Sequence, residues 1–151
     1  MSGLCILNRR LVFITLLIAA LLFTTACSEI RDVKNPRVGE LVEKISQMEY
    51  IVDVKADNMA FNLNIDVHFE RGFTEEDSLK ILELAKYYLD ADTVEALRIE
   101  FDQDRPPDTR IFIRDDEGSI VYSFRGSCYA SNDRTVPPAF KEYRWVDTGA
   151  L

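Results

Sequence analysis

The residues best able to do chemistry in this chain centre on one histidine. His68 is the only histidine, which excludes any metal site built on two imidazoles. Asp66 and Glu70 stand two residues to either side, so in an extended strand their side chains share its side. One of these carboxylates could orient His68 as a general base. The commoner explanation is an ordinary polar residue on the solvated face of a sheet, and we favour it.

Cys128 is the second candidate, in the sequence Gly-Ser-Cys-Tyr. A nucleophilic cysteine needs a nearby base or positive charge to lower its pKa. His68 could provide this only if the strands that carry the two residues were neighbours, which the spacing leaves open. A lone thiol packed under the C-terminal tail is the alternative. A small hydrolase or transferase using His68 and possibly Cys128 is therefore our second hypothesis, not our first.

The sequence contains no recognisable metal, phosphate or nucleophile motif. Asp102, Asp104 and Asp108 are spaced loosely like calcium ligands, but the glycine and glutamate of the EF-hand pattern are missing. Two prolines within this segment favour a solvated loop. The run Asp115 to Gly118 is explained by turn chemistry. We therefore expect no metal, no cofactor and no catalytic residue.

A polar strand face is the remaining candidate site. Phe61, Leu63, Ile65, Val67 and Phe69 alternate with Asn62, Asn64, Asp66, His68 and Glu70. Strict period two predicts one buried and one solvated face. Asparagine is a poor strand former, so two of them indicate either a solvated strand that resists aggregation or a surface for a partner. We place Arg98, Glu100 and Asp102 beside this face.

Two helices and five strands are expected to position these residues. Asn35-Pro36 predicts a helix start, followed by an apolar stripe to Met48. Thr74 and three acids predict the start of a second helix. Strands are predicted at residues 50–55, 61–69 and 97–102, with a hairpin formed by residues 110–114 and 119–125.

The predicted fold class is α+β, with the element order α-β-β-α-β-β-β. Two amphipathic helices should pack on one face of a largely antiparallel sheet, as a two-layer sandwich. We expect the core to include Leu63, Ile65, Val67, Leu82 and Phe101. Asn64 and Asp66 should lie outside it. The tail, residues 126–151, is the least determined part, although Tyr143 and Trp145 have strand spacing and should lie against the sheet.

The N-terminal segment predicts where the protein works. Arg9 and Arg10 precede a largely apolar run from Leu11 to Phe23, which is too short to span a bilayer. Small residues and Cys27 follow. Residues 1–28 resemble a bacterial lipoprotein signal peptide, with Thr24 standing where an aliphatic residue is usual. The resemblance implies cleavage after Ala26, lipid on the Cys27 sulfur, and anchoring on the extracytoplasmic side of a membrane in the bacterial cell envelope.

Three segments follow from this resemblance: a signal peptide at residues 1–26, a lipidated cysteine with a short tether at 27–35, and one α+β domain at 36–151. Cleavage would leave Cys128 as the domain's one free thiol, so the domain can form no internal disulfide. It would also remove two arginines and no acids, so the mature net charge falls from −8 to −10. Such a charge disfavours nucleic acid and electrostatic lipid binding.

Taken together, these features favour a non-catalytic module. We expect a small lipid-anchored envelope protein that binds a protein partner, or assembles or regulates a complex. The membrane is contacted through lipid on Cys27, and Asn62, Asn64, Asp66, His68 and Glu70 are the expected partner-binding face. A ligand carrier is less favoured, because the two helices and the sheet are expected to fill the core.

Overall fold

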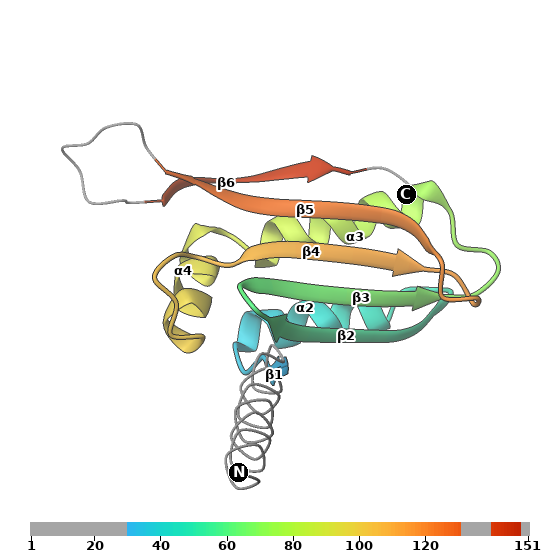
Figure 1. Ribbon diagram of the computed structural model, residues 1–151. Coiled ribbons are helices and arrows are strands. Elements are labelled where there is room, and N and C mark those ends of the chain that lie inside the picture. Colours follow the sequence, from blue (N-terminus) through green and yellow to red (C-terminus); the bar gives the residue numbers. More distant parts are fainter. Residues whose placement is uncertain (1–29, 131–139, 149–151) are drawn as a thin grey trace, which may run out of the picture.

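The computed structural model describes residues 30–130 and 140–148 (Figure 1). Its elements are β1 (Ile30–Asp32), α2 (Pro36–Ser46), β2 (Ile51–Met59), β3 (Asn62–Phe69), α3 (Glu75–Tyr88), α4 (Ala91–Glu100), β4 (Asp108–Arg114), β5 (Ile120–Ala130) and β6 (Phe140–Asp147). The predicted α+β class is confirmed. The predicted signal peptide and Cys27 lie outside the described residues. None of the described helices combines the length and hydropathy that a membrane span requires.

The six strands form one sheet in their chain order, β1 to β6. Neighbours are antiparallel except β3 and β4, which are parallel. Parallel strands need a long crossover, and α3 and α4 supply it. Figure 1 shows α2 and α3 on one side of the sheet, with α4 at one end. The sheet therefore has one face covered by helices and one face that we call the open face.

Both long helices begin at the predicted caps. The Asn35 side chain accepts a hydrogen bond from the Arg37 amide, and Pro36 occupies the first turn. Thr74 and Asp77 form a reciprocal capping box at the start of α3. Because the predicted caps form, α2 and α3 begin where the sequence indicates, and their apolar stripes face the sheet.

The core lies between these helices and the covered face of the sheet. Its fully buried side chains include Leu41 and Ile45 of α2, Ile81 of α3, Leu63, Ile65 and Val67 of β3, and Ile111 and Ile113 of β4. All five predicted core residues, Leu63, Ile65, Val67, Leu82 and Phe101, are buried. Phe61, by contrast, is 57% exposed, because it lies in the turn before β3 and not in the strand. The period-two pattern thus holds from Leu63 onward.

The predicted strand at residues 97–102 is wrong, because this segment belongs to α4 and its end. Asp90 caps the helix by accepting from the Thr93 amide. Leu97 is buried and Ile99 is 66% exposed, whereas strand alternation would have placed them on one face. Val94, Leu97 and Phe101 are spaced by three and four residues, and this helical stripe is the one that packs into the core.

Two strands extend the sheet beyond the predicted elements. Tyr143 and Trp145 lie on β6, as their spacing predicts, and both side chains pack against the core. At the other edge, β1 lies within the predicted tether of residues 27–35 and pairs with the end of β2. The first described strand therefore lies within the segment expected to be a simple linker.

Candidate functional site

The open face carries the polar residues that the sequence analysis selected. Strand pairing places Asn64 between Asp57 and Arg110, and Asp66 between Lys55 and Phe112. The Arg114 guanidinium contacts the Asp66 carboxylate at 2.8 Å, with both side chains 28% exposed. An Arg125–Asp108 pair at 2.7 Å links β5 to β4. Two separate ion pairs thus join β3 to β4 and β4 to β5 across this face.

Asn64 is not solvated as predicted, because its residue is only 6% exposed. Its amide donates a hydrogen bond of 3.1 Å to the Asp57 carboxylate. The alternation pattern correctly places Asn64 on the polar face of β3. That strand is central in the sheet, however, so neighbouring side chains on both sides shield it from water. The hydrogen bond compensates for this burial.

The other predicted face residues are distributed along the same strand. Asn62, Asp66 and His68 are half-buried on β3. Glu70 is exposed beyond the end of the strand, where its amide donates to the Tyr50 carbonyl. Arg98 and Glu100, which were expected beside this face, lie on α4 instead.

His68 does not have the surroundings of an oriented general base. The Asp66 carboxylate accepts a hydrogen bond from Arg114, and no side-chain hydrogen bond joins Asp66 to His68 in the described part of the chain. Across the sheet, His68 lies opposite Asp53. A hydrogen bond from Lys55 lowers the pKa of the Asp53 carboxyl, with a smaller contribution from the charge of His68. His68 is therefore one member of a charged surface.

The structure does not bring His68 and Cys128 together. His68 lies opposite Arg114 at one end of β4, whereas Gly126 lies opposite Thr109 near the other end. Cys128 is two residues beyond Gly126, so the offset along the strands is on the order of 20 Å at the usual rise per residue. One intervening strand, β4, adds to this separation. A Cys–His pair of the kind that activates a thiol is excluded by this geometry.

The acidic loop after α4 does not gather its carboxylates. Asp108 pairs with Arg125, and Asp102 is exposed. Within the described ranges, no three histidine, cysteine, aspartate or glutamate side chains are grouped closely enough to hold a metal ion. The loop has a different consequence, because it directs Gln103 inward.

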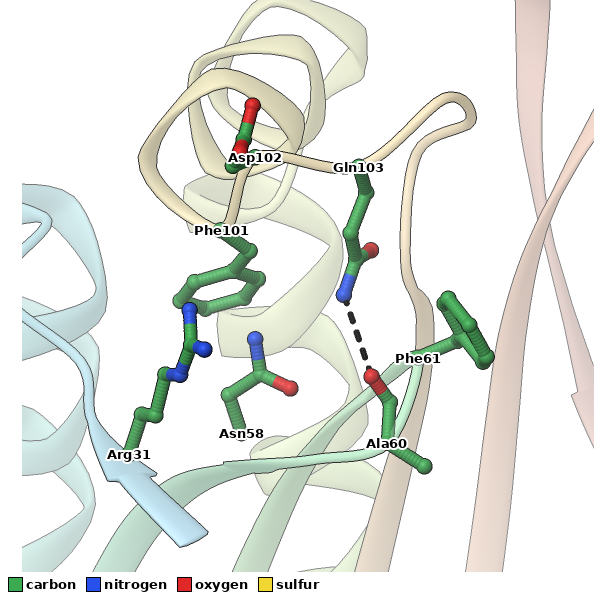
Figure 2. Close-up of a pocket in the computed structure, with 7 residues that line it drawn as sticks. All are labelled: Arg31, Asn58, Ala60, Phe61, Phe101, Asp102 and Gln103. Atoms are coloured by element: carbon green, nitrogen blue, oxygen red, sulfur yellow. Dashed lines mark hydrogen bonds between the residues drawn. The ribbon is translucent and has the colours of Figure 1, made fainter. Parts of the chain in front are cut away.

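A polar pocket lies where this loop meets the edge of the sheet (Figure 2). Its volume is about 230 Å³, and its walls come from β1, the end of β2, the β2–β3 turn and the end of α4. The lining residues are Arg31, Asn58, Ala60, Phe61, Phe101, Asp102 and Gln103. Figure 2 shows the side chains of Arg31 and Asn58 near the Phe101 ring and the Gln103 amide directed to the Ala60 carbonyl, while the Asp102 carboxylate points away from them.

The end of α4 places Gln103 in this pocket. The Asp102 amide donates to the Ile99 carbonyl and the Gln103 amide donates to the Arg98 carbonyl, which is the hydrogen-bond pattern of a Schellman motif. Asp102 takes the left-handed conformation that the motif requires, with φ of 53°. The chain therefore reverses sharply, and the side chain of Gln103 turns back toward the sheet.

The β2–β3 turn forms the opposite wall. Ala60 has φ of 61°, as tight hairpin turns demand of a central residue. Its carbonyl accepts a hydrogen bond of 3.3 Å from Gln103 Nε2. This bond fixes the orientation of the Gln103 amide and leaves Oε1 facing away from Ala60.

Two buried carboxamides in this pocket retain hydrogen-bonding capacity. Gln103 is 8% exposed, and its Oε1 has no partner among the described residues. Asn58 is 4% exposed and also makes no side-chain hydrogen bond within the described part of the chain. Leaving a buried acceptor without a partner costs about 1–3 kcal/mol, and in this pocket that cost applies to Gln103 Oε1.

Sequence reasoning missed this pocket entirely. Its residues come from three segments far apart in the chain, and no motif joins them. Gln103 stood within a loop that was interpreted as solvated. The turns that form its walls depend on positive φ at Ala60 and Asp102, and neither residue type reveals that conformation in the sequence.

No family model matches this chain, and no curated protein or solved structure matches it either.

Proposed function

We propose that this protein is a small lipid-anchored module of the bacterial cell envelope that binds a protein partner through the open face of its sheet. One observation carries the proposal. The helices α2 and α3 lie on the same side of the six-stranded sheet, and no described element covers the other side.

The chemistry of the open face suits recognition more than catalysis. Its ion pairs hold long side chains in fixed positions across neighbouring strands. Preset charges and hydrogen-bonding groups of both signs give a surface specificity for a complementary partner. Arg110 and Arg125 remain exposed on this face, so both are accessible to a bound protein. A partner can therefore dock on a surface that is already ordered.

The anchor follows from the resemblance of residues 1–28 to a lipoprotein signal peptide. Lipid on Cys27 would hold the mature chain on the extracytoplasmic side of its membrane. Ile30 of β1 comes three residues later, and three extended residues span about 10 Å. The domain would therefore begin close to the membrane surface, and its partner would also have to be at that surface.

The enzyme hypothesis loses its main support. It relied on His68 and possibly on Cys128, and these two residues lie toward opposite ends of the sheet. Among the described residues, no side-chain hydrogen bond joins His68 to a carboxylate that could orient it. No specific observation therefore favours a hydrolase or transferase.

Charge reversal on the open face tests the binding proposal. Arg110→Glu changes an exposed residue of β4, and Lys44→Glu makes the same charge change on the exposed side of α2. The full-length chain would be crosslinked in cells and its partners identified by mass spectrometry. We expect Arg110→Glu to lose a partner that the wild type and Lys44→Glu both retain. Retention of that partner by Arg110→Glu at the wild-type level would refute the role of the open face.

The anchor is tested separately with Cys27→Ser. We expect this variant to remain uncleaved and without lipid, while the wild type enters the detergent phase. Equal labelling of both proteins by a fatty-acid probe would refute lipidation at Cys27. The two experiments are independent, so one part of the proposal can fail without the other.

A further inference from the structure

We infer that a groove on the helical side of the domain binds an amphipathic helix of another protein, one whose apolar face is flanked by lysine or arginine residues. The groove lies where Met48, just past the end of α2, meets the first turns of α3. Both helices lie on the side of the sheet opposite to the open face (Figure 1). The inference therefore adds a second docking surface and does not depend on partner binding by the open face.

The unequal lengths of α2 and α3 leave room for this groove. The Arg37 guanidinium donates hydrogen bonds to the carbonyls of Tyr87 and Tyr88, so the start of α2 is joined to the end of α3. The two helices are therefore antiparallel. Because α2 has 11 residues and α3 has 14, α3 extends about one turn beyond α2. Beside that turn the neighbouring side chain is Met48, which fills less space than a helix.

The floor of the groove is apolar. Met48 and Leu84 are half-buried and pack against the core, while Leu79 is 47% exposed. The volume is about 580 Å³, within the range of roughly 300–1,000 Å³ that is usual for binding pockets. The lining residues are Met48, Glu76, Leu79, Lys80, Glu83 and Leu84. Covering these apolar side chains with those of a partner is favourable, and the flexible Met48 can adapt its shape to them.

The charges at the rim select a basic partner. Glu76 and Glu83 lie two turns apart on one side of α3, about 10 Å along its axis. Their side chains are 81% and 71% exposed, so cations of a partner can reach both, although each already contacts a lysine of α3. Lys80 is the one basic residue of the lining, and its charge is matched by Glu76 at 3.4 Å and Asp77 at 3.1 Å. The rim is therefore acidic as a whole.

Other occupants suit this groove less well. A second copy of the chain would bring the same acidic rims together, and like charges repel. Anionic lipid headgroups are disfavoured for the same reason. An extended peptide gains affinity by pairing with a strand edge, which a groove lined by α3 and Met48 does not offer. A helix satisfies its own backbone hydrogen bonds, and it can present leucines to the floor and lysines to the rim.

Three synthetic peptides of about 15 residues test the inference. The basic peptide has leucines at i, i+3, i+4 and i+7 with lysines on both sides of them. The acidic peptide has glutamate in place of each lysine, and the third peptide has the composition of the first with its leucines spread around the helix. Fluorescence anisotropy measures their binding to the full-length chain in phosphatidylcholine nanodiscs, with empty nanodiscs as the blank. We expect the basic peptide to bind at least about tenfold more tightly than the other two.

A pair of neutral variants connects this binding to the apolar floor. Leu79→Gln should weaken binding of the basic peptide about tenfold, because it removes the most exposed apolar side chain of the groove. Ile99→Gln makes a comparable change at a 66% exposed position of α4, outside the groove, and should have no effect. Circular dichroism of both variants establishes that the domain is folded.

A pair of charge variants tests the rim. The double variant Glu76→Lys, Glu83→Lys should reverse the preference and bind the acidic peptide more tightly than the basic one. The double variant Asp116→Lys, Glu117→Lys changes the net charge by the same amount at exposed positions of the β4–β5 turn. This control should keep the wild-type preference, since the effect depends on the groove and not on the total charge.

Four results would overturn the inference. The first two are equal binding of the basic and acidic peptides by the wild type, and unchanged binding of the basic peptide by Leu79→Gln. The third is no binding of any peptide at millimolar concentration. The fourth is self-association of the wild type that Leu79→Gln abolishes, which would assign the groove to a second copy of the chain. None of these results bears on the open face, which is tested with Arg110→Glu.

Discussion

Asn64 offers a direct test of how the open face contributes to stability. The residue is 6% exposed, and its amide donates to the Asp57 carboxylate at 3.1 Å. Asn64→Ala removes this donor and leaves a half-buried carboxylate with one fewer partner. Hydrogen bonds to charged groups contribute about 1.5–3 kcal/mol, so we expect the free energy of unfolding to fall by about that amount.

Asn62 provides the matched control for this substitution. It has the same side chain, lies on the same face of β3 two residues earlier, and is half-buried. No side-chain hydrogen bond involves it within the described ranges. Asn62→Ala should therefore change the free energy of unfolding by no more than about 0.5 kcal/mol.

Urea unfolding followed by circular dichroism would measure both variants under one condition. Linear extrapolation carries an error of about 10–15%, which is small enough to separate the two expected values. Equal losses for Asn62→Ala and Asn64→Ala would refute the reasoning, because they would show that the bond to Asp57 contributes nothing. A loss below about 0.5 kcal/mol for Asn64→Ala would refute it as well.

Two further predictions concern the helices. Leu97→Ala should lower the free energy of unfolding by about 2–5 kcal/mol, because Leu97 is fully buried in α4. Ile99→Ala changes a residue that is 66% exposed and should cost far less. Similar losses for the two variants in urea unfolding would contradict the helical assignment. Hydrogen bonds from Thr74 and Lys80 lower the pKa of Asp77 from 3.8. The stability that this lowered pKa contributes is present above pH 3.8 and is lost as the pH falls through the folded-state pKa. In acid unfolding, the free energy of unfolding of Asp77→Asn should therefore fall less steeply with decreasing pH than that of the wild type.

The elements with strong local signals were predictable from the sequence. The helix α2 begins at the predicted Asn35 cap, and α3 begins at the predicted Thr74 cap. The strand β3 shows alternation over its whole length, and its buried and polar sides are assigned correctly. In each case a cap or a long periodic pattern leaves one interpretation that satisfies both the backbone and the core.

The segment of α4 was not predictable in this way, because its apolar residues fit two periods. Leu97, Ile99 and Phe101 alternate as in a strand, whereas Val94, Leu97 and Phe101 recur as on a helix. The decision depends on Asp90, whose side chain caps the start of α4. Over so few residues, one capping interaction outweighs the pattern of side chains.

The sequence also could not predict how deeply the side chains of the open face are buried. Alternation shows on which side of the sheet Asn64 lies, but not how much water reaches it. The exposure of a strand residue depends on which strands flank it, and β3 lies between β2 and a parallel β4 that is joined through two helices. No local pattern specifies that pairing. The same limit hides the polar pocket, whose walls meet only once β1, the β2–β3 turn and the end of α4 are brought together.

The open face is close to neutral, although the composition of the mature chain is strongly acidic. The mature chain would carry a net charge of −10, yet the described charged side chains of this face are balanced. They are Asp32, Asp53, Asp57, Asp66 and Asp108 against Lys55, Arg110, Arg114, Arg125 and Arg144. The acidic excess therefore lies elsewhere on the described domain, as in the first turn of α3. A partner on the open face would meet alternating charges close to neutrality, so its specificity would come from the matching of individual groups more than from long-range attraction.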